Sequence, residues 1–100
     1  MNETLSKMLF LWALCVERLN SKIYTKADDA ELLNDICARN VLEKGKNELS
    51  NEQQKKLAEI DAEYKMTALP AITKAELLTA YVEASKFYPV EYWWWHVEER

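Results

Sequence analysis

The sequence predicts an all-α fold, a small four-helix bundle-like domain followed by a short aromatic C-terminal segment. Its 100 residues include a single glycine and two prolines, which leaves almost nothing for hairpin turns or glycine-rich loops. Apolar residues recur at spacings of three and four, as they do along one side of a helix. Three capping boxes, each a Ser or Thr followed three residues later by an acid or amide, precede such stretches.

The first helix is expected at about residues 3–22, with Asn2 as its N-cap. Its core-facing stripe consists of Leu5, Met8, Leu9, Trp12, Cys15, Val16, Leu19 and Ile23. Phe10, Leu11 and Leu14 add apolar surface on the opposite side, so the middle of this helix is apolar almost all round. Such a helix needs cover on two flanks, and we expect it at the centre of the fold.

The second helix is expected at about residues 26–44. Thr25 and Asp28 form the first capping box, in which the hydroxyl and the carboxylate satisfy each other's backbone donors. Asp29 and the other acids of the first turns suit the positive end of the helix dipole, which is a better explanation for them than metal binding. Gly45 is placed to take the left-handed conformation that ends many helices.

The third and fourth helices are expected at about residues 51–66 and 74–88, after capping boxes that begin at Ser50 and Thr73. The third helix has a narrow apolar seam, enough for one neighbour, made of Leu57, Ile60 and Tyr64. Pro70 is expected to separate the two helices, because the residue before a proline is driven out of the α region. The fourth helix has one apolar side, made of Leu77, Leu78, Tyr81, Val82, Ser85 and Tyr88.

The C-terminal segment, at about residues 90–98, holds the consecutive residues Trp93, Trp94 and Trp95. Three consecutive side chains sweep about 200° of a helix surface, so at least one indole should stay near solvent unless something covers it. The favoured packing places Trp93 and Trp95 over the outer apolar residues of the first helix and leaves Trp94 half-exposed. In the alternative, the segment is a contact surface, and Trp94→Ala should then change stability by less than about 1 kcal/mol.

Composition argues against nucleic-acid and membrane partners. A net charge of −4 and a pI near 5.0 lack the basic character of a nucleic-acid-binding domain. Glu17 and Arg18 end the long apolar run well before the ~20 residues that a membrane span needs. The chain's start also lacks the basic region and cleavage site of a signal peptide. We therefore expect a cytoplasmic protein.

Residues that could carry catalysis or hold a metal are few. His96 is the sole histidine, and nothing in the spacing brings it to Cys15 or Cys37. Both cysteines lie on apolar stripes and are expected to be buried, inert thiols in a reducing compartment. No zinc pattern, phosphate-binding loop or calcium-binding loop occurs. We expect no enzyme activity, no catalytic residue, no cofactor and no metal.

By elimination, the sequence favours a non-enzymatic protein that acts through a protein–protein surface, as an adaptor, inhibitor or regulatory subunit. Small acidic helical proteins without motifs are common among phage and mobile-element accessory genes directed at a host protein, an association that fits this hypothesis. The alternative is a self-assembling homodimeric structural protein. A small-molecule ligand is not evident. The candidate partner-binding residues are Phe10, Leu11, Leu14, Tyr92, Trp93, Trp94, Trp95 and His96.

A helix-turn-helix DNA binder is the third hypothesis. That motif joins its helices by a turn of about 3–4 residues, whereas the predicted interval from Met66 to Thr73 is longer and contains Pro70. The fourth helix also offers few side chains that could read base edges. Both features weigh against this hypothesis.

Overall fold

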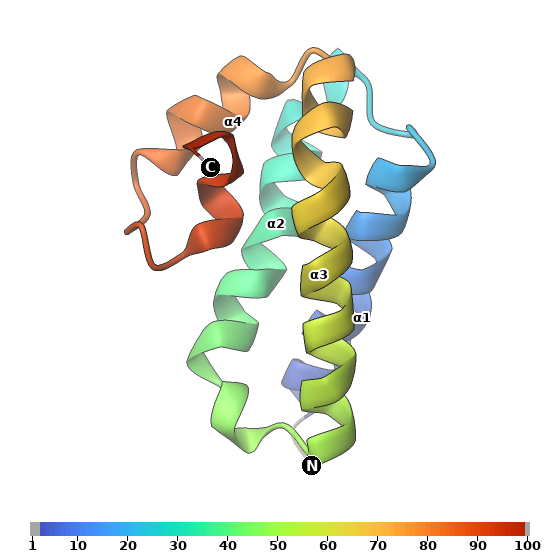
Figure 1. Cartoon of the computed structure of the whole chain (residues 1–100), viewed down its shortest axis with the longest axis vertical. Coiled ribbons are helices and arrows are strands. Elements are labelled where there is room, and N and C mark those ends of the chain that lie inside the picture. Colours follow the sequence, from blue (N-terminus) through green and yellow to red (C-terminus); the bar gives the residue numbers. More distant parts are fainter. Residues whose placement is uncertain (1–2, 100) are drawn as a thin grey trace.

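The all-α prediction is confirmed by a computed structural model, which describes residues 3–99 (Figure 1). This part of the chain contains no strand, and its α-helices are α1 (Glu3–Asn20), α2 (Asp29–Lys44), α3 (Asn51–Lys74) and α4 (Leu78–Ser85). Single 3₁₀ turns precede α2 and α3 and shape the C-terminus: η1 (Lys26–Asp28), η2 (Lys46–Glu48), η3 (Trp93–Trp95) and η4 (Val97–Glu99). We call residues 86–99 the C-terminal tail.

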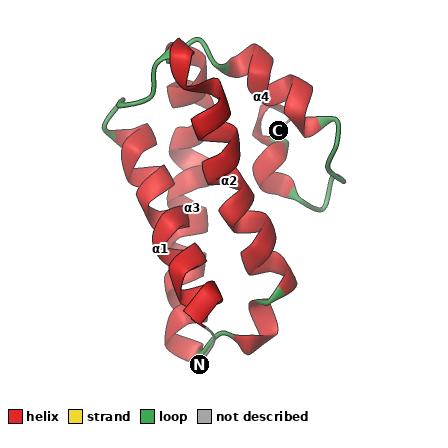
Figure 2. Ribbon diagram, turned by 180° about the vertical axis from the view of Figure 1, so that it is seen from behind, coloured by secondary structure: helices red, strands yellow, loops and turns green. Residues whose placement is uncertain are grey.

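The helices form a bundle in which α1 and the tail lie on opposite sides. α1 packs against α2 and α3, while α4 and the tail contact α2 and α3 from the other side. Figures 1 and 2 show this arrangement from front and back. The sequence led us to expect the first helix at the centre of the fold, but α1 lies on one side of it. It has neighbours along its inner side only, and its outer side has no helix against it within residues 3–99.

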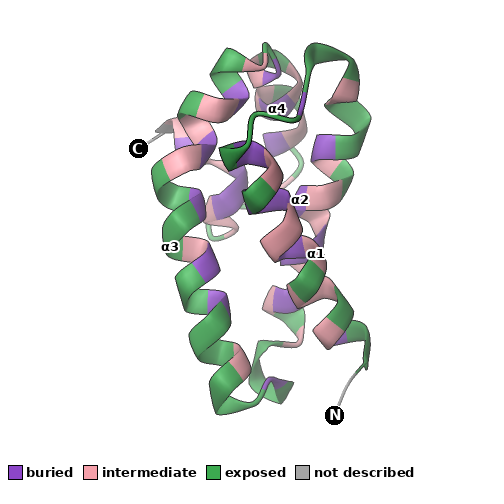
Figure 3. Ribbon diagram, turned by 90° about the vertical axis from the view of Figure 1, so that its right-hand side faces the viewer, coloured by how far each residue is buried: buried purple, intermediate pink, exposed green. Residues whose placement is uncertain are grey.

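Buried residues face inward on every α-helix, as the coloured bands in Figure 3 show. On α1 the expected stripe is buried at Leu5, Trp12, Cys15, Val16 and Leu19. Met8 and Leu9 are half-buried, and Ile23 is exposed because α1 ends at Asn20, which leaves Ile23 in the connection to α2. The apolar seam of α3 is also confirmed, and it extends further than expected, through Ala68 and Ile72.

Two of the three expected capping boxes form. The Thr25 backbone N–H donates to Asp28 at 2.8 Å, and the Ala27 N–H donates to the Thr25 hydroxyl. At the start of α3, the Ser50 N–H donates to the Gln53 side chain at 3.0 Å, and the Gln53 N–H donates to the Ser50 hydroxyl at 3.1 Å. Each pair satisfies backbone donors that the first helical turn leaves unpaired.

The predicted boundary between the third and fourth helices is wrong. α3 continues through Pro70 to Lys74, so Thr73 lies in its last turn and does not cap a new helix. The proline removes one backbone donor at an exposed position. Ala68 and Ile72, on either side of it, are fully buried, and we attribute the persistence of the helix to their packing. α4 is correspondingly shorter than predicted, from Leu78 to Ser85.

The prediction for Gly45 is also wrong. Its φ angle is −101°, outside the left-handed region. Gly45 has no side chain, and this leaves room for the side chain of Leu5. A Cβ atom at Gly45 would lie 2.5 Å from Cδ2 of Leu5. A glycine at this position therefore lets the end of α2 approach the first turns of α1 closely.

Left-handed residues do end the other two long helices. Lys22 (φ 57°) follows α1 and Glu76 (φ 64°) follows α3. After α3, the Glu76 N–H donates to the Thr73 carbonyl and the Leu77 N–H to the Ile72 carbonyl, both at 3.0 Å. The same pair of bonds ends α1. This is the Schellman arrangement, which satisfies the last carbonyls of a helix.

Glu76→Gly should raise the free energy of unfolding by about 0.5–1 kcal/mol. A left-handed conformation costs an ordinary residue roughly 1–2 kcal/mol, and glycine avoids this at a smaller entropic cost. Urea unfolding at pH 7 measures the change. Glu83→Gly is the matched control, since Glu83 is an exposed acid inside α4, and it should lose about 1 kcal/mol. Equal losses in both variants would contradict this account of Glu76.

Candidate functional site

The fold divides the candidate partner-binding residues into two groups. Phe10, Leu11 and Leu14 belong to α1, whereas residues 92–96 belong to the tail on the other side of α2 and α3 (Figures 1 and 2). The expectation that the tryptophans cover the outer residues of the first helix is therefore wrong. The two groups do not form one surface, so each has to be considered separately.

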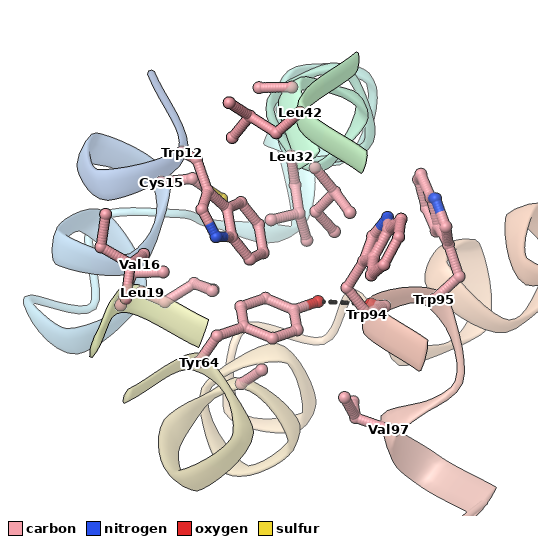
Figure 4. Packing of buried hydrophobic residues seen from close by; sticks show 14 of the residues in the cluster. Trp12, Cys15, Val16, Leu19, Leu32, Leu42, Tyr64, Trp94, Trp95 and Val97 are labelled. Atoms are coloured by element: carbon pink, nitrogen blue, oxygen red, sulfur yellow. Dashed lines mark hydrogen bonds between the residues drawn. The ribbon is translucent and has the colours of Figure 1, made fainter. Parts of the chain in front are cut away.

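The tryptophans of the tail belong to the core. Trp94 and Trp95 are each 1% exposed, and Trp93 is half-buried. The expected order was the reverse, with Trp94 as the half-exposed ring. The indole N–H groups of Trp94 and Trp95 both donate to the side-chain oxygen of Asn40 in α2, at 2.6 and 2.9 Å. Asn40 is thus a shared acceptor for two adjacent indoles, and Figure 4 shows both of these indoles among the buried residues.

The backbone of the tail is held as firmly as its indoles. The hydroxyls of Tyr64 in α3 and Tyr81 in α4 both donate to the Trp94 carbonyl at 2.8 Å, and Figure 4 shows the Tyr64 bond. The Val97 N–H in turn donates to the Tyr81 hydroxyl at 3.1 Å. Because these polar groups are buried and paired, the tail from Trp94 to Val97 is a structural element and not an exposed contact surface.

The remaining candidate partner-binding residues of the tail lie around the buried Trp94 and Trp95. Tyr92 is half-buried, and its ring stacks on Trp94 with centroids 4.7 Å apart. His96 is also half-buried, and its Nε2 lies 2.9 Å from the Tyr88 carbonyl oxygen. Trp93 packs edge-on against Trp94, and the Lys65 ammonium lies 4.6 Å from its ring centroid. Each of these three side chains therefore has a contact within the fold.

A buried arginine, which the sequence reasoning missed as a core residue, connects the helices. Arg39 of α2 donates from Nε and Nη2 to the two carboxylate oxygens of Asp61 in α3, at 2.9 and 3.0 Å. It also donates to Glu43 at 3.0 Å, and its guanidinium lies 4.4 Å from the Trp94 ring centroid. The Trp12 indole N–H donates to the same Asp61 carboxylate at 3.0 Å. The sequence does contain a signal for the burial of Arg39, because it lies three residues after Ile36, on the same side of α2.

This arrangement of Arg39 and Asp61 is structural. The guanidinium is held by two carboxylates and an indole face, and the Asp61 carboxylate receives three hydrogen bonds. A catalytic group needs a free position for substrate, and these contacts occupy the polar atoms of both side chains.

The two cysteines differ in burial. Cys15 is fully buried, and burial raises the pKa of its thiol from 9.0 to about 12. Cys37 is only half-buried, contrary to expectation, and its Sγ lies 3.7 Å from the Tyr88 hydroxyl. A thiol with a raised pKa is a poor nucleophile at neutral pH. Among residues 3–99, no group of three or more His, Cys, Asp or Glu side chains is arranged to hold a metal ion.

Stability should fall at alkaline pH. Burial raises the pKa of Cys15, and it raises the pKa of Tyr64 well above 10.0. The fold thus favours the neutral forms of both groups, so their contribution to the free energy of unfolding is complete below pH 9. This contribution is lost above pH 9, as the two groups deprotonate in the unfolded chain. The loss should reach at most about 1.4 kcal/mol per pH unit for each group.

Urea unfolding from pH 8 to 11 measures this loss. Cys15→Ala should lower the overall stability but show a shallower fall between pH 9 and 10, because one titrating group is missing. A free energy of unfolding that stays constant from pH 8 to 11 would contradict the assignment.

An apolar groove lies between α1 and α2, on a part of α1 that the tail does not cover. Its volume is about 240 Å³, and its lining residues are Met8, Leu11, Asn34, Asp35, Cys37, Ala38 and Val41. We call this hollow the α1–α2 groove. Val41 is 39% exposed, and Phe10, which follows Leu9 on the outer side of α1, is 65% exposed. Leu14 is half-buried on the same helix.

The tail has its own exposed apolar side chains. Phe87 is 85% exposed and Val90 is 69% exposed, in the turn that leads from α4 into η3. The sequence reasoning did not single out either residue. In the sequence Lys86 precedes Phe87 and Glu91 follows Val90, so a charged residue adjoins each of them.

The structure removes one argument against a helix-turn-helix. Because α3 extends to Lys74, only residues 75–77 separate it from α4, a turn length that the motif allows. The composition of α4 still argues against DNA recognition. Its eight residues include no arginine, lysine, asparagine or glutamine, the side chains that most often read base edges.

No family model, curated protein or solved structure matches this chain. Within residues 3–99, no helix combines the length and the apolar character needed to cross a lipid bilayer. Function therefore has to be inferred from the surface of the molecule itself.

Proposed function

We propose that this chain is a non-enzymatic protein that binds another protein through the outer side of α1, where Phe10 is exposed, together with the α1–α2 groove, as an adaptor, inhibitor or regulatory subunit. The observation that carries the proposal is the exposure of Phe10 on the side of α1 where no other helix packs. Trp94 and Trp95, the other large apolar side chains that suggested a contact surface, are buried by the fold. Phe10 is the candidate that stays available.

The groove has the chemistry of a site for an amphipathic helix. Met8 and Leu11 of α1 form one wall and Ala38 and Val41 of α2 the other, with polar Asn34 at the edge. Such grooves bind apolar side chains that recur every three or four residues of a partner helix. Methionine adapts its shape to different partners. Burying a phenylalanine side chain contributes roughly 1.5–3 kcal/mol, which suits Phe10 as an anchor.

Phe10→Asp tests the proposal, with Phe87→Asp as the matched control. Both residues are exposed phenylalanines, one on the outer side of α1 and one in the tail. Each variant should unfold within about 0.5 kcal/mol of the parent chain, as surface substitutions do. Quantitative affinity capture from cells of the source organism should recover a protein with the parent chain and with Phe87→Asp, and lose it with Phe10→Asp. Loss with Phe87→Asp alone would move the site to the tail and contradict the proposal.

Light scattering of the purified chain distinguishes the occupants of the groove. A monomer across micromolar concentrations supports a heterologous partner. A dimer that Phe10→Asp dissociates would replace this proposal with self-assembly through the same surface. Retardation of duplex DNA at low salt, with a steep salt dependence, would favour the helix-turn-helix hypothesis instead.

A further inference from the structure

A second hollow region lies at the other end of α1, beside the end of α3. Two adjoining hollows of about 200 and 330 Å³ share the lining residues Leu19, Lys22, Ala71 and Lys74. The first also contacts Arg18, Tyr24 and Ala75, and the second reaches Met66 and Pro70. We call the pair the end trough. In Figures 1 and 2 the connection from α1 to α2 passes beside the end of α3.

The apolar floor of the end trough follows from the small residues of α3. Ala71 and Ala75 leave space next to Leu19, which is itself buried. α1 ends at Asn20, so no further helical turn fills that space. The result is an apolar surface wide enough for a short hydrocarbon chain but smaller than most drug-sized pockets.

The edges of the end trough are basic, although the protein carries a net charge of −4. Arg18 is neutralised by Glu31 and Asp35, each 3.2 Å from its Nη1. Lys22 and Lys74 line both hollows, and the ion pairs of residues 3–99 include neither of them. Two ammonium groups are thus available to an anion at this place.

Helix C-termini normally repel anions because their last carbonyls are unpaired. Here the left-handed residues Lys22 and Glu76 close both helix ends. The Arg18 carbonyl accepts from Ile23 at 3.1 Å and the Leu19 carbonyl from Lys22 at 3.2 Å, and the carbonyls of Ile72 and Thr73 are paired in the same way. The pairing of these carbonyls reduces the repulsion that an anion in the end trough would meet.

We propose that the end trough binds a small carboxylic acid with a short apolar chain. The carboxylate lies between Lys22 and Lys74, and the chain lies on Leu19, Ala71 and Ala75. Charge-assisted bonds from ammonium to carboxylate are about twice as strong as neutral ones, and the apolar floor adds the hydrophobic contribution. The site shares no lining residue with the α1–α2 groove, so the proposal is independent of the protein-binding function.

Calorimetric titration of the purified chain with hexanoate at pH 7 and low salt tests the proposal. Hexan-1-ol has the same chain without charge, and inorganic phosphate has charge without the chain. Hexanoate should bind at least tenfold more tightly than either, and the methyl resonances of Leu19, Ala71 and Ala75 should shift on binding. Equal affinity for hexanoate and hexan-1-ol, or for hexanoate and phosphate, would overturn the proposal.

Charge-matched variants locate the site. Lys22→Gln combined with Lys74→Gln should weaken hexanoate binding at least tenfold. Lys55→Gln combined with Lys56→Gln makes the same change of charge on an exposed part of α3 and should leave the affinity within twofold. Unchanged binding in the first pair, or equal weakening in both pairs, would contradict a site in the end trough.

Discussion

Replacing Trp94 with alanine is expected to lower the free energy of unfolding by about 3–5 kcal/mol. Trp94 is 1% exposed, its N–H donates to Asn40, and its ring receives the guanidinium of Arg39. Removing the ring would leave a large cavity between α2, α3 and the tail, and two polar groups would lose a partner. A loss of this size is a large part of the stability of a domain of 100 residues.

Trp93→Ala is the matched control, because Trp93 is the half-buried neighbour in the same turn. Its loss should be about 1–2 kcal/mol, since less surface is removed from the core. Urea unfolding of both variants measures the difference. A change below 1 kcal/mol in Trp94→Ala would restore the expectation of an exposed contact surface and contradict the packing of the tail.

Replacing Asp61 with alanine is expected to cost about 3–5 kcal/mol, the range found when one partner of a buried ion pair is removed. Of its two carboxylate partners Arg39 would keep Glu43 alone, while its charge stays almost fully buried. The Trp12 indole N–H would lose its acceptor as well. The cost arises mainly from the unpaired charge, because a buried pair itself adds little net stability.

Two further variants separate this effect from the loss of a surface acid. Asp61→Asn keeps an acceptor for Trp12 and for one Arg39 donor, so it should lose less than Asp61→Ala. Glu59→Ala removes an exposed acid from the same helix and should stay within about 0.5 kcal/mol of the parent chain. Denaturation midpoints that are equal for Asp61→Ala and Glu59→Ala would show that the buried ion pair is not needed.

Features that depend on neighbours in the sequence could be predicted. The capping boxes at Thr25 and Ser50 form as expected, because each needs only residues three positions apart. The apolar stripe of α1 and the seam of α3 are buried for the same reason, since helical spacing alone places them on one side.

Features that depend on distant contacts could not be predicted. Pro70 disfavours a helix locally, yet Ala68 and Ile72 are buried on either side of it and α3 continues. Which of the three adjacent indoles is half-exposed depends on Asn40, more than fifty residues away. Arg39 could not be recognised as a buried residue from the sequence, because its partner Asp61 lies on another helix.

The candidate site was predicted only in part. The surplus of apolar surface on the first helix was visible in Phe10, Leu11 and Leu14, and Phe10 is indeed exposed. The tail looked equally apolar, but Asn40, Tyr64 and Tyr81 supply polar partners that allow it to enter the core. Sequence shows how much apolar surface a chain has, whereas the tertiary contacts decide which part stays outside.

Photo-crosslinking from position 10 tests the central claim most directly. A photoreactive phenylalanine analogue is placed at Phe10 or at Phe87, and the chain is irradiated in cells of the source organism. The account predicts a discrete crosslinked product from position 10 that contains a different protein, and no such product from position 87. A product from position 87 with none from position 10 would contradict the claim that the outer side of α1 is part of the binding surface.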